Sequence, residues 1–364
     1  MNDQDNPLVS VIIPAYNAQA SIARTLESVA AQIYSNLEIL IVDDGSKDRT
    51  VEIIRQFARQ DSRIELLQQS NAGVAAARNL ALTKARGELI APLDADDIWY
   101  PHNIALQVRA MKQGSQSVGL VYSWSVDINE RDRPTGGFKA SQITGDVYTT
   151  LIAHNFIGNA SATMMRRSCL ERIGTYNLAF KEQNAQGCED WELYLRIAEH
   201  YKFQVVREFG VGYRKISSSM SCDYGVMAKS HSLIMTSVRQ KHPNLPKYLF
   251  QISNSNLYMY FAHQSDRYQS HELTRLWLSE ALKADFFTPW IRLGFYRLML
   301  SSTWGLIASS NPTSTAISSS VENINIQNNK KFFEMVKPYQ ASKITLNLML
   351  LSGDIFHWLI NTLF

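Results

Sequence analysis

Apolar strand-like runs alternate with amphipathic helical segments through the first hundred residues of this chain. The strand-like runs cover residues 9–13, 37–42, 64–68 and 89–93. The segments between them, residues 21–31, 48–58 and 74–85, have apolar residues at helical spacing. Strands joined by helices in this way pair in parallel and are covered on both faces. The sequence therefore predicts an α/β fold built on a mostly parallel sheet.

Three carboxylates follow the fourth strand-like run directly, at Asp94, Asp96 and Asp97. Like charges packed together repel, and a bound cation relieves that repulsion. Carboxylate oxygens suit Mg²⁺ or Mn²⁺, which commonly hold a diphosphate as well. The alternative is a polar loop in which Asp97 caps the next helix. The acidic motif alone leaves both interpretations open.

Other polar residues also follow the predicted strands, and ligands of parallel sheets bind at the carboxyl ends of the strands. These residues are Tyr16, Asp43, Asp44, Asn71 and Arg78. No G-x-G-x-x-G follows the first strand, and no G-x-x-x-x-G-K-[ST] occurs. These two absences disfavour a dinucleotide-binding protein and a P-loop protein. The polar residues therefore predict a different kind of ligand site at this edge of the sheet.

Four segments of this region, in order and spacing, resemble the family 2 glycosyltransferases with the GT-A fold. The segments read VSVIIPAYNA, LIVDDGSKDRT, NAGVAAARNLAL and LIAPLDADDIWYP. The resemblance implies a nucleotide-diphosphate sugar donor, most often a UDP-sugar, and inversion at the anomeric carbon. It also implies a divalent metal, Mn²⁺ or Mg²⁺.

The resemblance assigns expected roles to individual residues. Pro14, Ala15 and Tyr16 would line the base and ribose. Asp43 and Asp44 would contact the same groups, with Asp44 preferred for the base. Arg78 would reach the nucleotide, Asp94 would lie near the ribose and the metal, and Asp96 would bind the metal. Taken singly, these motifs also fit strand-end packing, an Asx turn before Gly45, and a solvated helix residue at Arg78.

An acidic pair, Glu189 and Asp190, begins a later segment with helical spacing. Negative charge is favoured at a helix N-terminus, so simple capping is one interpretation. In the resembled family an acidic pair here supplies the general base, and Asp190 matches it, while Glu189 would support the base or contact the acceptor. The family's Gly-Gly-Phe-Asp-like turn reads Gly-Thr-Tyr-Asn here, so Asn177 replaces the aspartate and any contact that needs a charge there is in doubt.

A Tyr-Arg pair followed by a serine-rich loop occurs at residues 213–221. In related enzymes this loop lies over the nucleotide, so Arg214 and Lys215 are expected to pair with the diphosphate. An ordinary flexible connection is the alternative. The Gln-x-x-Arg-Trp motif of processive members is absent, which favours transfer of one sugar per encounter.

The net charge and the cysteines limit which partners and which cellular compartment we expect. The net charge of +3 is too mild to indicate nucleic acid as a partner. Three widely spaced cysteines without a C-x-x-C pair predict reduced thiols and no zinc site. With no signal-peptide pattern at residues 1–14, a cytoplasmic protein is expected.

The C-terminal third is predicted to be helical and to differ from the rest. We expect a glycosyltransferase domain over 1–225, a helical extension over 226–308, a linker over 309–329 and an amphipathic helical segment over 330–364. Met259, Tyr260 and Ala262 are expected to face Leu276, Trp277 and Ala281 in a helical hairpin. Residues 286–308 and 344–364 are apolar enough for peripheral membrane contact, although core or oligomer packing is the alternative.

The resemblance implies an inverting glycosyltransferase acting on a glycan or lipid-linked acceptor, in cell-surface polysaccharide synthesis at the inner face of the plasma membrane. A non-catalytic nucleotide-sugar binding protein is a second possibility. A sugar nucleotidyltransferase is a third, but it needs a Gly-rich, Lys-containing loop after the first strand, and PAYNA is not such a loop.

Overall fold

The computed structural model describes residues 6–215 and 223–309. The chain divides into two compact units between Pro243 and Asn244, and each unit is described here by itself. Helix α9 (Tyr224–Lys241) groups with the first unit rather than with a helical extension that begins at residue 226. The predicted linker over 309–329 and the predicted segment over 330–364 lie, apart from residue 309, outside the described residues. In the described part, no helix is both long and apolar enough to cross a membrane.

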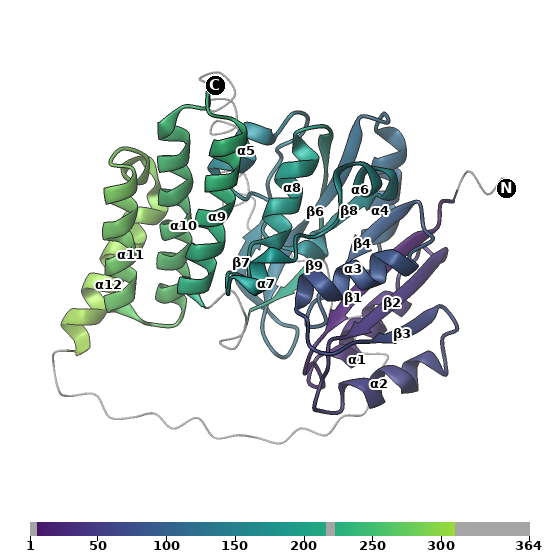
Figure 1. Ribbon diagram of the computed structural model, residues 1–364. Helices are drawn as coiled ribbons and strands as arrows, with labels where there is room; N and C mark the ends of the chain where they lie inside the picture. The colour runs from purple at the N-terminus through teal and green to yellow at the C-terminus, as the bar shows by residue number, and fades with distance from the viewer. Residues whose placement is uncertain (1–5, 216–222, 310–364) are drawn as a thin grey trace. The chain divides into compact units, whose positions relative to one another are not determined.

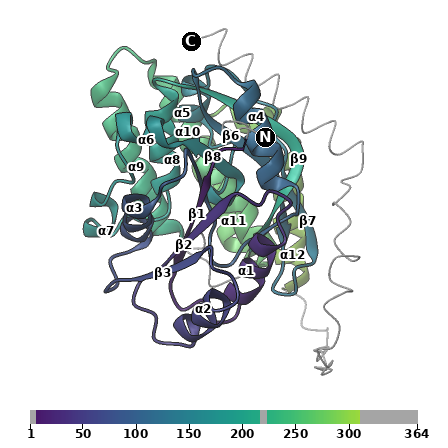
Figure 2. The ribbon, with the colours of Figure 1, turned by 90° about the vertical axis from the view of Figure 1, so that its right-hand side faces the viewer.

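The first four strands form the parallel half of a single sheet, as predicted. They are β1 (Val9–Ala15), β2 (Leu37–Asp43), β3 (Ile64–Gln68) and β4 (Leu89–Pro92). Helices α1 (Ile22–Ala30), α2 (Thr50–Ala58) and α3 (Val74–Lys84) connect them. The ladder between β1 and β2 continues past the predicted strand end to pair Ala15 with Asp43. In Figure 2, α3 lies on one side of β1 and β2, and α1 lies on the other.

The second half of the sheet is mixed, which corrects the prediction of a mostly parallel sheet. It contains β5 (Ile98–Trp99), β6 (Val118–Ile128), β7 (Pro134–Lys139), β8 (Thr163–Arg166) and β9 (Lys202–Arg214). The order is β3-β2-β1-β4-β8-β6-β9-β5, with β7 paired to β6 (Figure 1). Strand β8 runs antiparallel to β4 and to β6. The segment that connects β4 to β8 is long and contains other strands, so it is not a simple strand-helix-strand unit. It can therefore return the chain in the antiparallel direction.

The first unit has further helices, some of which pack against the strands of this mixed half. They are α4 (Asn103–Gln113), α5 (Tyr148–Ala153), α6 (Arg167–Ile173), α7 (Ala179–Glu182), α8 (Glu189–Ala198) and α9. A short 3-10 turn, Ala160–Ala162, precedes β8. Every residue of β2 and of β6 is buried, so the sheet is the core of the unit. Its buried strands end at polar loops, which is where the candidate site lies.

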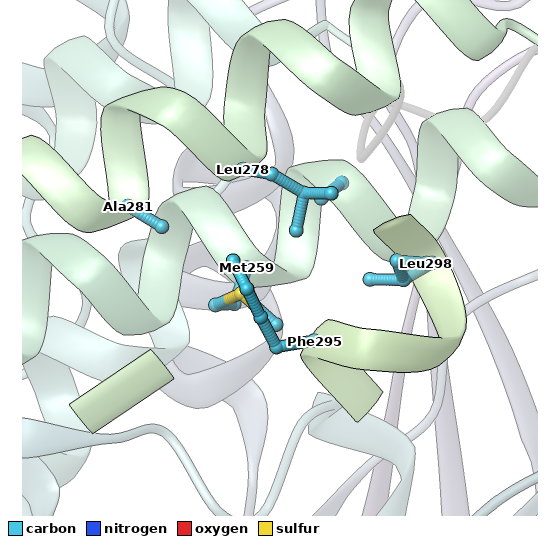
Figure 3. Packing of buried hydrophobic residues seen from close by; sticks show 6 residues of the cluster. Met259, Leu278, Ala281, Phe295 and Leu298 are labelled. Carbon is cyan, nitrogen blue, oxygen red and sulfur yellow. The ribbon is translucent and has the colours of Figure 1, made fainter. Parts of the chain in front are cut away.

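The second unit is helical, with a small core of its own. Its elements are α10 (Lys247–Arg267), α11 (His271–Ala284), a 3-10 turn at Thr288–Ile291 and α12 (Leu293–Ser309). Figure 3 shows the core, formed by Met259, Ala262, Leu278, Ala281, Phe295 and Leu298. The predicted pairing of α10 with α11 is confirmed, and Tyr258 stacks on Trp277 at 5.8 Å. Leu276, however, is exposed, and Leu278 occupies the core instead.

Candidate active site

The loops after β1 and β2 are joined by hydrogen bonds. Asn17 N–H donates to Ser46 Oγ at 2.9 Å, and Lys47 N–H donates to Asn17 Oδ1 at 2.9 Å. Asn17 adopts the left-handed conformation, with φ of 49°, which asparagine tolerates better than most residues. The Tyr16 ring beside it is half-exposed. Pro14, Ala15 and Tyr16 therefore lie at a fixed strand end with one open aromatic face.

The two carboxylates after β2 have different surroundings. Asp44 is buried and accepts three hydrogen bonds, from Gln69 Nε2 at 2.7 Å, Ala72 N–H at 2.7 Å and Gly73 N–H at 2.8 Å. Asp43 is also buried but accepts only one side-chain hydrogen bond from the described residues, from Ser46 N–H at 3.3 Å. The Asp44 carboxylate therefore holds the turn before α3, which argues against our expectation that Asp44 contacts the base.

The acidic loop after β4 separates its three carboxylates by environment. Asp97 is fully buried, and its carboxylate accepts from Ser161 Oγ at 2.5 Å and from Arg214 N–H at 2.8 Å. It caps no helix, because α4 begins only at Asn103 with His102 at its cap. Asp94 and Asp96 are only partly buried. The two partly exposed carboxylates are thus the ones available to a ligand.

Arg78 joins the acidic loop to the start of α8. Its Nη2 donates to Asp94 Oδ1 at 2.6 Å, and its Nη1 donates to Asp190 Oδ1 at 2.7 Å. The Arg78 side chain is 3% exposed, while those of Asp94 and Asp190 are 28% and 26% exposed. Helix α3 therefore places one buried cation between two carboxylates that remain open to solvent. The solvated-residue interpretation of Arg78 is wrong.

The electrostatics of this cluster favour a carboxylate that exchanges a proton near neutral pH. Burial, opposed by Arg78 and assisted by Asp94 and Glu189, raises the pKa of Asp190 to about 7. Burial also raises the pKa of Glu189, whose Oε2 accepts from Gly187 N–H at 2.8 Å. Glu189 Oε1 is buried and has no hydrogen-bond partner in the part of the chain that the structure describes. A general base works best with a pKa close to the operating pH, and Asp190 meets that condition.

Arg214 is directed into the protein, which is a correction to its expected contact with a diphosphate. Its Nε donates to Asp96 O at 2.6 Å and its Nη1 donates to Asn129 O at 2.5 Å. Its Nη2 pairs with Asp132. All three nitrogens are occupied and the side chain is 2% exposed, so Arg214 supports the acidic loop from behind. The adjacent serine-rich loop, 216–222, lies outside the described residues.

The residues present fit a divalent metal held together with a substrate diphosphate. Within residues 6–215 and 223–309, no three His, Cys, Asp or Glu side chains gather as a complete metal site. Mg²⁺, however, is often bound by one or two carboxylates plus phosphates and water. Burial and the neighbouring Asp94 raise the pKa of Asp96 to about 6, a cost that a cation beside both groups would relieve. Asp94 and Asp96 therefore suit the expected Mn²⁺ or Mg²⁺.

Two residues near Arg78 had no role in the sequence analysis. The Tyr176 ring centroid lies 5.1 Å from the Arg78 guanidinium carbon, and Tyr176 is buried. Asn79 fixes the turn that carries this ring, since it donates to Tyr176 O at 2.8 Å and accepts from Tyr176 N–H at 2.9 Å. Asn177 accepts from Ala179 N–H at 3.0 Å. The motif at residues 174–177 is the sequence signal that could have identified Tyr176 as part of the site.

Residues 10–174 match the family model described as Glycosyl transferase family 2. The UDP-Glc:alpha-D-GlcNAc-diphosphoundecaprenol beta-1,3-glucosyltransferase WfgD of Escherichia coli is 40% identical over 139 residues, which are 38% of this chain and 53% of that protein. The hyaluronan synthase of Pasteurella multocida is 26% identical over 234 residues, which are 63% of this chain and 23% of that protein. The chain spans about half the length of the first curated relatives it matches.

Solved structures resemble this chain in fold. S. aureus TarS superimposes with a TM-score of 0.52 and 18% identity, covering 82% of this chain and 54% of that one. The mannosyltransferase PcManGT of Pyrobaculum calidifontis, solved with GDP-Man and Mn²⁺, gives 0.50 and 20%, covering 85% and 77%. These likenesses confirm the predicted fold. Glu189 and Asp190 lie beyond the residues that the family model matches, so their roles rest on geometry.

Proposed function

Because this chain carries a family 2 glycosyltransferase domain, we propose that it transfers one sugar, with inversion, from a nucleotide-diphosphate donor to an acceptor hydroxyl. The observation that carries this proposal is the Arg78 bridge between Asp94 and Asp190. The bridge joins a carboxylate suited to metal and diphosphate to a carboxylate suited to proton removal. In a direct displacement, the donor would lie on the Asp94 side of this bridge and the acceptor hydroxyl on the Asp190 side.

In the proposed reaction, Asp190 accepts the proton of the acceptor hydroxyl as its oxygen attacks the anomeric carbon. The carbon–oxygen bond to the diphosphate breaks, and the nucleoside diphosphate leaves with the electron pair. Asp94 and Asp96 would hold the divalent cation, which would neutralise the charge that grows on the diphosphate. Arg78 holds the Asp190 carboxylate in place and favours its ionised form.

For the nucleotide we propose UDP. The half-exposed Tyr16 ring offers a stacking face to uracil, with Pro14 and Ala15 beside it. Asp43 is the carboxylate we now assign to the base N–H, because Asp44 already accepts three hydrogen bonds from its own turn. The name of the E. coli relative, a glucosyltransferase that uses UDP-Glc and a diphosphoundecaprenol-linked sugar, supports a UDP-sugar and a lipid-linked or glycan acceptor in cell-surface polysaccharide synthesis.

The test is release of nucleoside diphosphate from a panel of UDP-, GDP- and dTDP-sugars. Metal-dependent release from one donor supports the proposal and identifies the sugar. Donor binding without release, even when membrane extract supplies an acceptor, would favour a non-catalytic nucleotide-sugar binding protein. Failure of every donor to bind would overturn the assignment.

Metal removal gives a direct check on Asp94 and Asp96. We expect chelation to lower the release rate about 100-fold, since charge neutralisation by a metal contributes several kcal/mol, and added Mn²⁺ to restore it. Asp96→Asn should show the same loss and should resist rescue at ordinary Mn²⁺ concentrations. Asp146→Asn, an exposed carboxylate paired with Lys202 at 3.6 Å, is the matched control and should behave as wild type. Chelator-resistant activity would contradict the metal proposal.

We also propose that the second unit binds the surface of an anionic bilayer, which would place the enzyme at the inner face of the plasma membrane. Its 3-10 turn and α12 expose large apolar side chains, with Leu293 80% and Trp304 77% exposed. Residues 286–309 contain two arginines and no acidic residue. Aromatic and apolar side chains with only positive charge suit an anionic lipid interface. The second segment expected to contact the membrane, 344–364, lies outside the described residues.

Vesicle co-sedimentation tests this surface. We expect the protein to bind vesicles of phosphatidylglycerol and phosphatidylcholine more strongly than phosphatidylcholine alone. The double variant Leu293→Gln/Trp304→Ser should weaken binding about tenfold or more, given the apolar area that it removes. Leu178→Gln, an exposed leucine of the first unit, is the control. A dimer in light scattering that the double variant dissociates would show instead that a second copy covers these residues.

A further inference from the structure

A second polar cluster lies on one face of the mixed half of the sheet, in the same unit as the candidate active site. Lys139 pairs with Ser125 across β7 and β6, and Asp127 pairs with Tyr213 across β6 and β9. Side chains of residues two apart on a strand share a face, as do directly opposed residues. The register therefore gathers Ser125, Asp127, Lys139 and Tyr213 on one face.

Positive charge outnumbers negative charge in this cluster. Lys215 Nζ lies 3.1 Å from Asp127 Oδ2 and 5.6 Å from the centroid of the Tyr213 ring. The Lys215 and Asp127 side chains are 11% and 8% exposed. Among the described residues, the half-buried Lys139 ammonium has no hydrogen-bond or ion-pair partner. An ammonium in this position is costly unless an anion accompanies it.

Two glycines make room for these charged groups. A Cβ on Gly137 would lie 2.3 Å from Asp127 Oδ2, and a Cβ on Gly158 would lie 3.3 Å from Lys139 Cε. Gly158 has φ of +91°, which favours glycine there independently. The backbone therefore approaches both side chains closely, so the cluster is packed rather than a loose surface charge pair.

A buried amide follows Gly158, the glycine that lies against the Lys139 side chain. Asn159 follows Gly158, is 7% exposed and donates from Nδ2 to Ser125 Oγ at 3.0 Å. Its Oδ1 is buried and has no hydrogen-bond partner among residues 6–215 and 223–309. A buried acceptor left unpaired costs free energy that a donor group from a ligand recovers. Ser125 accepts from Asn159 and lies opposite Lys139 in the ladder, so a ligand that carries both a hydroxyl and an anion suits these two side chains.

The cluster is connected to the acidic loop through two short paths along the chain. Ser161, two residues after Asn159, accepts from Asp94 N–H at 3.1 Å and donates to Asp97. Arg214, next to Lys215, donates to Asp96 O at 2.6 Å. A group bound between Asn159 and Lys215 would therefore contact two segments that hydrogen-bond to the loop of Asp94 and Asp96.

We propose that Lys139, Lys215 and Asn159 form a binding site for a sugar phosphate, in which the lysines hold the phosphoryl oxygens and Asn159 Oδ1 accepts a sugar hydroxyl. This inference rests on the proposed sugar transfer. Two substrates present the same chemistry: the diphosphate sugar of the donor and a phosphate-linked sugar acceptor. The low pKa of Lys139, reduced to about 8 by burial and by Lys215 against the opposing effect of Asp127, agrees with an ammonium that lacks a close counter-ion.

Calorimetric titration of the full chain tests the site, with inorganic pyrophosphate and glucose 1-phosphate as probes and no divalent cation present. Lys139→Met should weaken both by about tenfold or more, the loss expected for one charge-assisted hydrogen bond, while Lys139→Arg keeps most of the affinity. Asn159→Ala should weaken glucose 1-phosphate and leave pyrophosphate unchanged. Lys202→Met, an exposed lysine of β9 paired with Asp146, is the control, and thermal melting confirms that each variant folds.

A parallel UDP titration identifies the source of the phosphate. Weaker UDP binding in Lys139→Met assigns the site to the donor diphosphate, and unchanged UDP binding assigns it to the acceptor. If the wild type binds neither probe, or if Lys139→Met binds both as tightly as the wild type, the site is overturned. Release of UDP from UDP-sugars by the wild type is measured separately. Failure of the transferase proposal is therefore distinguishable from failure of this site.

Discussion

Asp190→Asn is expected to lower the rate of sugar transfer by about 10³-fold while donor binding persists. The amide keeps the shape of the side chain and its contact with Arg78 but cannot accept the hydroxyl proton, and a positioned general base contributes about 10²- to 10⁴-fold. Because a base acts only when deprotonated, wild-type activity should fall as the pH drops below the Asp190 pKa of about 7. The measurement is nucleoside diphosphate release against pH, together with calorimetric donor affinity.

Glu192 provides a matched control on the same helical turn. It pairs with Arg196 at 2.8 Å, away from Arg78, so Glu192→Gln should retain the wild-type rate and pH profile. The general-base assignment is contradicted if Asp190→Asn keeps more than about a tenth of the rate, or if the acid limb survives in that variant. Loss of donor affinity in Asp190→Asn would instead make this residue part of the donor site.

The sequence predicted the strand ends of the parallel half well, because local apolar patterns and turn residues decide where a buried strand stops. The regions where prediction failed depend on contacts between distant segments. The antiparallel entry of β8 between β4 and β6 follows no local signal. Trp99 and Asp97, adjacent in the chain to the acidic motif, are buried against Ser161 more than sixty residues later. A local sequence pattern of ten or twenty residues cannot reveal a partner so far along the chain.

The arginines show the same limit in the candidate site. Arg78 and Arg214 both stand in motifs that suggest a phosphate contact, and their residue type is the same. The structure separates them by direction: Arg78 faces two partly open carboxylates, whereas Arg214 donates to Asp96 O, Asn129 O and Asp132 inside the protein. Direction depends on which strand or helix carries each residue and on what lies beneath it. The spacing of motifs carries no such information.

Arg78→Met is expected to have the largest effect on stability, lowering the free energy of unfolding by about 3 kcal/mol. Removing one partner from a buried ion pair costs about 3–5 kcal/mol, and the lower end applies because Asp94 and Asp190 keep about a quarter of their side-chain surface exposed. Denaturant unfolding measures this loss. Arg49→Met, in which an exposed arginine loses its pair with Glu52, is the control and should leave the free energy of unfolding nearly unchanged.

The same substitution should move the acid limb of the pH–rate profile for sugar transfer to higher pH. Burial, Asp94 and Glu189 raise the pKa of Asp190, and Arg78 lowers it. Without Arg78 the Asp190 pKa therefore rises above about 7, and less of the base is ionised at neutral pH. Raising the pH should then recover part of the lost rate. In a double-mutant cycle, Asp190→Asn should cost less stability on the Arg78→Met background than on the wild type, because the Arg78 cation that attracts the Asp190 carboxylate is already gone. Additive losses, with an unshifted acid limb, would show that Arg78 is a packing residue and that its bridge between Asp94 and Asp190 does not tune the base.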